Sequence, residues 1–260
     1  MIDIKVSVLN SGSNGNSVFV KSNKTRLLFD AGLSGKQIAE RLAYIGEDIS
    51  KVDALFVSHE HVDHTRGVGV LARRLNLPIY MSEDTFENCQ HIVGKIDNLM
   101  TLKHNKQISI EDLKIKSFNL SHDASDTCGF IVENEKKLGI MTDLGYGCEN
   151  AIKQIGKLNA VVLESNHDVD MLMNGRYPYF LKQRISSNHG HLSNIDCAKL
   201  IDDYASNKLE NIFLAHLSQD NNTPDTAMNT FKQLTNNNDK LHKLKTHMTS
   251  RLGPTKIFDV

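Results

Sequence analysis

The sequence contains no tryptophan, and only four prolines and four cysteines among its 260 residues. The cysteines are far apart and form no CxxC pair, which excludes a zinc ribbon and argues against a disulfide framework. Cys148 alone stays a candidate ligand, because it closely follows Asp143, an aspartate that matters below. Otherwise we expect inert or buried thiols at Cys89, Cys128, Cys148 and Cys197.

Long apolar runs are missing as well, since none approaches the roughly 18 residues that a membrane span requires. The start, Met1 to Val6, lacks the charged and apolar regions of a secretory signal, so we expect a cytoplasmic protein. Neither sign of charge is in excess, because 30 basic and 31 acidic residues give a net charge of -1. Any affinity for nucleic acid therefore has to come from local patches.

Strand and helix patterns alternate in both halves of the chain, and no Pro/Gly/Ser-rich linker divides them. They predict one α/β domain over residues 1–260, with two sheets sandwiched between helices. Strands are predicted at residues 5–9, 18–20, 26–29, 54–57, 77–80, 107–110, 113–119, 128–132, 137–141, 160–163 and 212–215. Helices are predicted at residues 34–45, 67–75, 83–89, 194–204 and 223–234.

The loop over residues 11–17, SGSNGNS, is rich in turn-forming residues. It lacks the Lys-Ser/Thr of a P-loop and precedes a strand rather than a helix. It is therefore either a plain hairpin turn or a backbone nest near a site.

A dense cluster of ligand-type residues, His59, His61, Asp63 and His64, directly follows the apolar strand 54–57. Residues two apart in extended backbone point the same way, so His59 and His61 can share one ion, while Asp63 and His64 lie past the turn near a second. Buried imidazoles and carboxylates are unfavourable unless they are paired or bound to a metal. The cluster therefore predicts a metal site rather than a solvated loop.

Further ligands have to come from other strand ends, because two ions need about seven protein ligands. His122, Asp143 and His216 each come at the end of an apolar strand. A strand-end polar residue also often caps or hydrogen-bonds a loop, so each of the three keeps that alternative.

The HxHxDH motif, followed by single His, Asp and His residues at later strand ends, resembles the metallo-β-lactamase superfamily. That resemblance implies a four-layer αββα sandwich with a dinuclear site between its sheets. It also implies that Asp143 bridges the ions and that Asp30, in FDAG, orients a ligand imidazole from outside the ligand set. The implied ligands are His59, His61 and His122 for the first ion, and Asp63, His64 and His216 for the second.

Longer segments are similar to the YycJ/WalJ branch of this superfamily, which is associated with exonuclease activity on double-stranded DNA from the 5′ end. They cover nearly the whole chain up to a basic C-terminal segment that begins near residue 236. The segments are LNSGSNGNS, DAGLSGKQ, LFVSHEHVDHTRGVGVLARRLNLPIY, VLESNHDVDMLMNGRYP and FLAHLSQDNN.

The resemblance assigns His191, ahead of a predicted helix, the place of the histidine that protonates the leaving oxygen in phosphodiesterase branches. His189 is the local rival, and a histidine hydrogen-bonded to its loop is the structural alternative. The expected reaction is attack of a metal-bridged hydroxide on phosphorus. Asp63 and His191 are the expected catalytic residues.

Substrate contacts are expected from a mobile arm that carries Arg176, Tyr177, Lys182 and Arg184, although a solvated loop fits the same sequence. Asn188 and His189 are further candidates. For His167 three alternatives stay open: it hydrogen-bonds a metal ligand without binding the metal itself, it contacts substrate, or it lies on the surface. The C-terminal lysines and arginine are either a solvated tail or an aid to polyanion binding: Lys240, Lys243, Lys245, Arg251 and Lys256.

These observations predict a dinuclear Zn, Mn or Fe hydrolase, acting as a 5′-3′ exonuclease on the phosphate backbone of double- or single-stranded DNA. One alternative is a hydrolase of a small ester, thioester or cyclic phosphodiester on the same site. Another is a metal-stabilised binding module without turnover. Fold resemblance alone does not choose the substrate.

Overall fold

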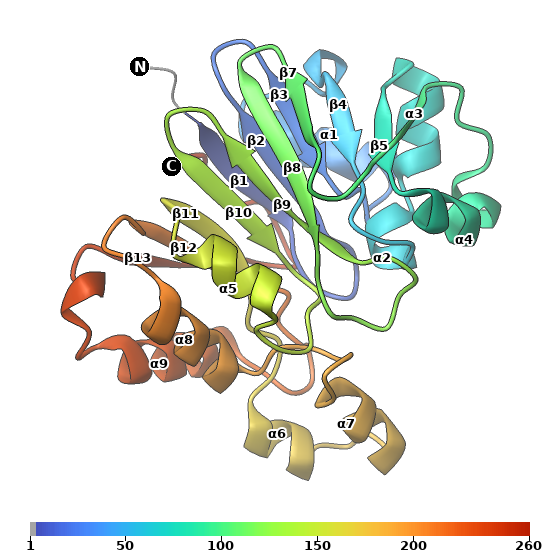
Figure 1. The fold of residues 1–260 in the computed structure, drawn as a ribbon. Coiled ribbons are helices and arrows are strands. Elements are labelled where there is room, and N and C mark those ends of the chain that lie inside the picture. The colour runs from blue at the N-terminus through green and yellow to red at the C-terminus, as the bar shows by residue number, and fades with distance from the viewer. Residues whose placement is uncertain (1–3) are drawn as a thin grey trace.

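Two seven-stranded sheets form the centre of the computed structural model, which describes residues 4–260. Residues 1–3, on which part of the signal-peptide prediction rests, lie outside the described residues. The sheets lie face to face, with helices on both outer sides (Figure 1). The first sheet has the order β14-β1-β2-β3-β4-β5-β6, and the second has the order β13-β12-β11-β10-β9-β8-β7.

Every predicted strand is present with nearly its predicted bounds. Strands β6, β13 and β14 were not predicted, because they are short and lie partly exposed. The first sheet contains β1 (Lys5–Asn10), β2 (Ser17–Lys21), β3 (Arg26–Phe29), β4 (Ala54–Phe56), β5 (Ile79–Met81), β6 (Leu99–Thr101) and β14 (Phe258–Asp259). The second contains β7 (Gln107–Ile110), β8 (Leu113–Asn119), β9 (Cys128–Glu133), β10 (Lys137–Met141), β11 (Ala160–Glu164), β12 (Asn211–Ala215) and β13 (Lys245–Met248).

The helices form the two outer layers. Short 3₁₀ turns at Ile49–Lys51 and Asp239–Leu241 connect other elements. The first sheet carries α1 (Gly35–Tyr44), α2 (Val62–Thr65), α3 (Val68–Leu75) and α4 (Glu83–Val93) on its side of the molecule. The second carries α5 (Glu149–Ile155), α8 (Asn194–Tyr204) and α9 (Pro224–Thr235), while α6 (Val169–Asn174) and α7 (Tyr179–Ile185) project beyond the sheets (Figure 1).

Strand β4 shows why the strand before the histidine cluster is apolar throughout. Ala54 and Phe56 belong to the core between the two sheets, whereas Leu55 and Val57 pack in the core beneath the helices of the first sheet. Successive residues of a strand face opposite sides, so a strand buried on both faces has no polar position. The chain therefore places its first polar side chains where the strand ends.

The C-terminal segment is built into both sheets, so the prediction of a solvated tail was wrong. Strand β13 pairs in parallel with β12, and β14 pairs antiparallel with β1. The ring of Phe258 packs against Phe213 and His247, and Val260 is buried. Such long-range pairing cannot be read from a segment with many lysines, because its partner strands lie far away in the sequence.

Helix α1 confirms the predicted N-cap at Ser34, whose hydroxyl accepts a hydrogen bond from Gln37 N in a capping box. Helices α5, α6 and α7 were not predicted, since each has only six or seven residues. None of the helices within residues 4–260 has the length and apolar character needed to cross a bilayer. The fold confirms the predicted αββα sandwich, while its division into one domain stays a prediction.

Candidate metal centre

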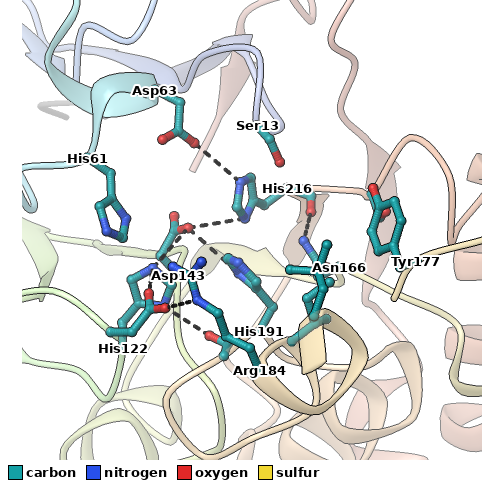
Figure 2. A pocket seen from close by; sticks show the side chains of 15 residues that line it. Ser13, His61, Asp63, His122, Asp143, Asn166, Tyr177, Arg184, His191 and His216 are labelled. Atoms are coloured by element: carbon teal, nitrogen blue, oxygen red, sulfur yellow. Dashed lines mark hydrogen bonds and ion pairs between the residues drawn. The ribbon is translucent and has the colours of Figure 1, made fainter. Parts of the chain in front are cut away.

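Side chains that follow the carboxyl ends of four strands converge on one cavity of about 320 Å³ (Figure 2). Its walls include the side chains of His61, Asp63, His122, Asp143 and His216, which the sequence predicted as ligands. They come from different elements: two follow β4, and one each follows β8, β10 and β12. Loops at strand ends bring them together, as is usual for sites in α/β proteins.

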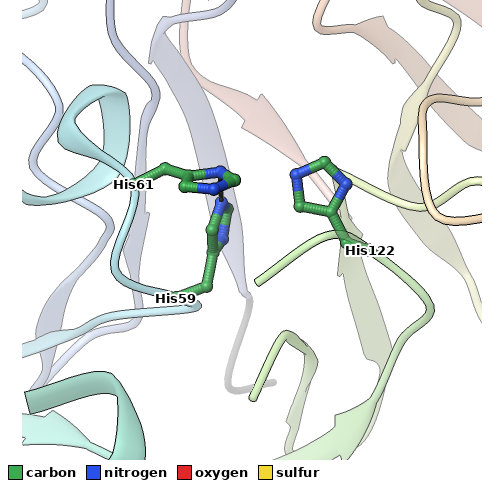
Figure 3. Close-up of side chains that lie close together, drawn as sticks. All are labelled: His59, His61 and His122. Carbon is green, nitrogen blue, oxygen red and sulfur yellow. Dashed lines mark hydrogen bonds between the residues drawn. The ribbon is translucent and has the colours of Figure 1, made fainter. Parts of the chain in front are cut away.

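Three imidazoles form the first group at this cavity (Figure 3). His59 Nε2 lies 3.1 Å from His61 Nδ1, and the ring of His122 lies 5.2 Å from each of the other two rings. One nitrogen from each residue falls within 4.8 Å of the others, which is compatible with one shared ion. Burial, together with the nearby His64, holds the pKa of His59 well below its usual value.

His64 lies on the other side of His59, on helix α2, where it is fully buried. Its Nδ1 lies 2.8 Å from Asp30 Oδ2, which leaves Nε2 facing the cavity, 3.1 Å from Asp143 Oδ2 and 3.7 Å from Asp63 Oδ2. Burial lowers its pKa, but the carboxylates of Asp30 and Asp143 outweigh burial and raise the pKa well above the usual value. Asp30 thus has the geometry expected of a carboxylate that orients an imidazole.

Asp143 occupies the centre of the arrangement. Its Oδ1 lies 3.3 Å from His216 Nδ1 and 3.9 Å from His122 Nε2, while its Oδ2 lies 3.1 Å from His64 Nε2. Burial opposes ionisation, but His216 and His64 hold the pKa of this carboxyl well below its usual value. An ionised carboxylate between both groups of histidines has the position of a bridge.

The set predicted for the second ion is looser than the first. Asp63 Oδ2 lies 3.7 Å from His64 Nε2 and 3.8 Å from His216 Nε2. The rings of His64 and His216 are 6.4 Å apart. The closest groups of donors instead combine His59 and His64 with Asp143, and Asp143, Glu164 and His191 with His216.

Glu164 is a site residue that the sequence prediction missed. It is the last residue of β11 and is fully buried, and its Oε1 accepts hydrogen bonds from His191 Nδ1 at 2.8 Å and His216 Nδ1 at 2.7 Å. Burial disfavours its charge, yet His191 and His216 lower its pKa to about 2. The available signal was its place at a strand end, the same signal that identified His122, Asp143 and His216.

Asn16 is a second missed residue, and it explains the loop over residues 11–17. The loop is a hairpin turn between β1 and β2, and it also reaches the site. The buried side-chain amide Nδ2 of Asn16 lies 3.2 Å from Asp63 Oδ2 and 2.9 Å from His64 Nε2. Its backbone N–H also donates to Asp63 O at 2.7 Å.

Three residues at the site have a left-handed backbone that side chains rarely adopt. Asp30, Asp143 and His216 have φ values of 61°, 60° and 56°. Each costs about 1–3 kcal/mol relative to an extended backbone, and such residues cluster at functional sites. Asp30 and His216 directly follow a strand, and Asp143 comes two residues after the end of β10, so each left-handed residue lies in the turn that leaves a strand at the site.

The donors fit a divalent metal. His216 Nε2 is buried and has no hydrogen-bond partner among residues 4–260, since Asp63 Oδ2 lies 3.8 Å away. Buried polar atoms without partners are rare in native proteins and often mark an ion. Imidazole nitrogens and carboxylate oxygens without thiolate are donors that suit Zn, Mn or Fe. The structure thus supports a divalent metal site.

Comparison with known proteins agrees with this geometry. A family described as the β-lactamase superfamily domain matches residues 25–216. The chain is 40% identical to the exodeoxyribonuclease YycJ of Bacillus anthracis over 88% of both chains. It is 39% identical to the exodeoxyribonuclease WalJ of Streptococcus pneumoniae, over 87% of this chain and 86% of that protein. The chain belongs to the metallo-β-lactamase superfamily, in the family of YycJ and WalJ.

The fold of this YycJ/WalJ family member matches solved structures of the superfamily over its full length. One is the metallo-β-lactamase fold protein YhfI from Bacillus subtilis, with a TM-score of 0.75, 16% identity and full coverage of both chains. The predicted resemblance is therefore confirmed, and the protein is a hydrolase of this superfamily.

His191 lies beside the candidate ligands of this YycJ/WalJ family member, at the cavity wall. Burial lowers its pKa, but Glu164 outweighs burial and raises it. Its rival His189 is exposed and does not line the cavity, and Asn188 is exposed too, with its carbonyl bound to the Ser121 hydroxyl. Of Asn188, His189 and His191, only His191 lines the cavity.

The predicted mobile arm is largely helical, because Lys182 and Arg184 lie on α7 while Arg176 and Tyr177 lie in the short connection between α6 and α7. Tyr177 lines the cavity and donates to Asp220 at 2.8 Å, and Lys182 donates to Met173 O at 2.7 Å. Arg184 pairs with Asp123 at the cavity. Lys182 and Arg184 therefore have protein partners, whereas Arg176 is exposed and has no hydrogen bond or ion pair within the described residues.

Two further predictions concern His167 and Cys148. His167 is buried, so the surface alternative was wrong, and it does not line the cavity. Its backbone pairs with Ser193, ahead of α8. Among residues 4–260 no group of candidate ligands includes a cysteine, and Cys148 is instead the N-cap of α5.

Proposed function

We propose that this protein is a dinuclear metal-dependent phosphodiester hydrolase that degrades DNA from the 5′ end. The identity to the exodeoxyribonucleases YycJ and WalJ, over most of both chains, supports the DNA substrate. The observation that carries the reaction is His191, held by Glu164 at a cavity that is lined by five of the seven candidate ligands. A cytoplasmic location fits a DNA substrate and stays a prediction.

The ligands proposed for the first ion are the three imidazoles of His59, His61 and His122. Those proposed for the second are Asp63, His64 and His216, with Asp143 shared between both. Glu164 and Asp30 lie behind this set and accept the Nδ1 protons of His216 and His64, which leaves each Nε2 as the donor atom for a metal. When bound, Zn, Mn or Fe ions supply Lewis acidity and activate water.

His191 has the geometry of a general acid. Its Nδ1 is bound to Glu164, so Nε2 is the nitrogen available to the cavity. The carboxylate favours the protonated imidazole, because it raises the pKa of His191 despite burial. His191 can thus hold a proton near neutral pH and transfer it from Nε2 to a leaving oxygen. The proposed role of Asp63 is to align the attacking group from the opposite wall.

The test uses purified protein loaded in turn with Zn, Mn and Fe. The substrates are duplex and single-stranded DNA that carry a label at the 3′ end. One set is protected by phosphorothioate linkages at the 5′ end, and the other set at the 3′ end. We expect degradation that stops only when the 5′ end is protected, and we expect none by His61→Ala. Intact DNA with every metal, or equal degradation by His61→Ala, rules the proposal out.

A small ester, thioester or cyclic phosphodiester is the second candidate substrate, because the cavity of about 320 Å³ is of a size that encloses a small ligand. A salt titration separates the two candidates. Added salt weakens binding of a DNA polymer steeply through counterion release, but it changes binding of a small substrate far less.

A further inference from the structure

Two aromatic side chains that are adjacent in sequence on α7 are largely exposed to solvent. Tyr179 and Phe180 are each 71% exposed, and Met173 on the adjacent α6 is 51% exposed. Large apolar side chains gathered in water are unfavourable and commonly mark a binding surface. We call the surface of Tyr179 and Phe180 the aromatic platform.

The aromatic platform stands at the rim of the cavity. Tyr177 and Leu181, on either side of the pair in sequence, both line the cavity, as does Ile185 one turn further along α7. Because consecutive Cα atoms are about 3.8 Å apart, both aromatic residues lie within about 8 Å of a lining residue along the backbone. Leu181 and Ile185 lie one helical turn apart, so one side of α7 faces the cavity while Tyr179 and Phe180 are exposed, on a helix that projects beyond the two sheets (Figure 1).

The platform is held in place from both ends. The Tyr177 hydroxyl is bound to Asp220, which follows His216 in the same loop, and Lys182 ties α7 to the last turn of α6. Arg184 is paired with Asp123, which directly follows His122. These contacts fix the backbone of α7, so that a ligand that stacks on its aromatic side chains does not have to order the helix first.

One exposed cation close to the platform in sequence has no partner, whereas the exposed carboxylate of Asp220 accepts the Tyr177 hydroxyl. Arg176 lies one residue before Tyr177 and has no hydrogen bond or ion pair among residues 4–260, so its guanidinium is available to a phosphate. Aromatic planes beside a free cation are the elements that bind single-stranded nucleic acid, because every base has a stacking face and every linkage has a charge.

We propose that the aromatic platform stacks unpaired bases of the strand whose phosphate enters the candidate metal centre. This inference rests on the proposed nuclease function and narrows its substrate to strands with unpaired bases beside the scissile linkage. Stacking is tolerant of sequence, which an exonuclease needs, since each successive base has to be held in turn. A duplex end then has to fray before it is cut.

The experiment compares wild type, Tyr179→Ala/Phe180→Ala and the control Tyr204→Ala, which removes a 45% exposed tyrosine on α8. Affinity is measured for single-stranded oligonucleotides with phosphorothioate linkages, in which one base at a time is replaced by an abasic site. We expect the double variant to bind at least tenfold more weakly, as for one lost base–aromatic stack. Tyr204→Ala should bind like wild type.

The abasic series distinguishes stacking from a general structural effect. One or two abasic positions should weaken binding by wild type and leave binding by the double variant unchanged, while Tyr179→Trp/Phe180→Trp restores affinity. On unprotected DNA, KM should rise while kcat stays close to wild type. Equal losses at all positions, or no loss of affinity, overturn the inference and point to another partner, such as a protein, for this surface.

Failure of the two proposals gives different results. If wild type and the double variant cut DNA equally well, the nuclease function stands and the proposed role of the aromatic platform is refuted. Wild type that neither binds nor cuts any oligonucleotide refutes both, because the platform then has no strand to hold.

Discussion

His191 Nδ1 lies 2.8 Å from Glu164 Oε1, and the same oxygen lies 2.7 Å from Nδ1 of His216. One buried carboxylate therefore orients the proposed general acid and a proposed metal ligand together. The other oxygen, Oε2, accepts the backbone N–H of Leu144 at 2.8 Å, so the carboxylate itself is held by the loop that follows Asp143. A change at Glu164 should disturb proton transfer and metal binding together.

Glu164→Gln keeps the size of the side chain but can no longer accept two charged hydrogen bonds. We expect kcat on DNA to fall about 10- to 100-fold, the usual effect of removing a partner behind a metal ligand. Steady-state kinetics with saturating metal measure this. Glu149→Gln, on the exposed side of α5, is the matched control and should retain full activity.

The pH profile of the same variant reports on His191. Glu164 raises the pKa of His191, so an acid at this position stays protonated to higher pH than an isolated histidine. Activity that needs this proton falls as pH rises through that pKa, and in Glu164→Gln the fall should come at lower pH. An unchanged alkaline limb in kcat against pH would argue that another group is the acid.

Asn16→Ala should weaken metal binding rather than folding. The amide lies 3.2 Å from Asp63 Oδ2, so its loss frees this proposed ligand to move. We expect about 10- to 100-fold lower metal affinity, measured by competition with a chelating dye. Asn14→Ala lies in the same loop and contacts no candidate ligand, and it should bind metal normally.

Gly32→Ala tests the contact between the loop after β3 and the histidine cluster. A Cβ at Gly32 would lie 1.6 Å from Asp63 O and 2.5 Å from Asn16 N, so the backbone that carries Asp63 has to shift. We expect about 1–3 kcal/mol lower free energy of unfolding in urea, together with weaker metal binding. Gly253→Ala has open space around the new Cβ and should change neither quantity.

Deletion of residues 254–260 tests whether the C-terminal segment stabilises the fold. It removes β14 from the edge of β1, together with buried Val260 and the ring of Phe258 that packs on Phe213. Each such side chain is worth about 1.5–3 kcal/mol when fully buried, so we expect a loss of about 3 kcal/mol in urea unfolding. Lys243→Ala, in the same segment, should change stability by less than about 0.5 kcal/mol. A deletion variant as stable as wild type would show that residues 254–260 do not stabilise the fold.

Local sequence was enough to identify most of the strands, the longer helices and the position of the site. Apolar runs such as residues 54–57 can be recognised from neighbouring residues alone, and the polar residues that follow a run indicate where the strand ends. The HxHxDH motif was recognisable because its four ligand-type residues lie within six positions.

Tertiary contacts decided what local patterns could not. Glu164 becomes part of the site only when β11 lies between β10 and β12, which brings it to His191 and His216 at once. Asn16 reaches Asp63 through the packing of one hairpin turn against a distant loop, and β13 and β14 exist because partner strands accept them. Each of these contacts joins residues far apart in sequence, so its free energy appears only when the whole chain has folded.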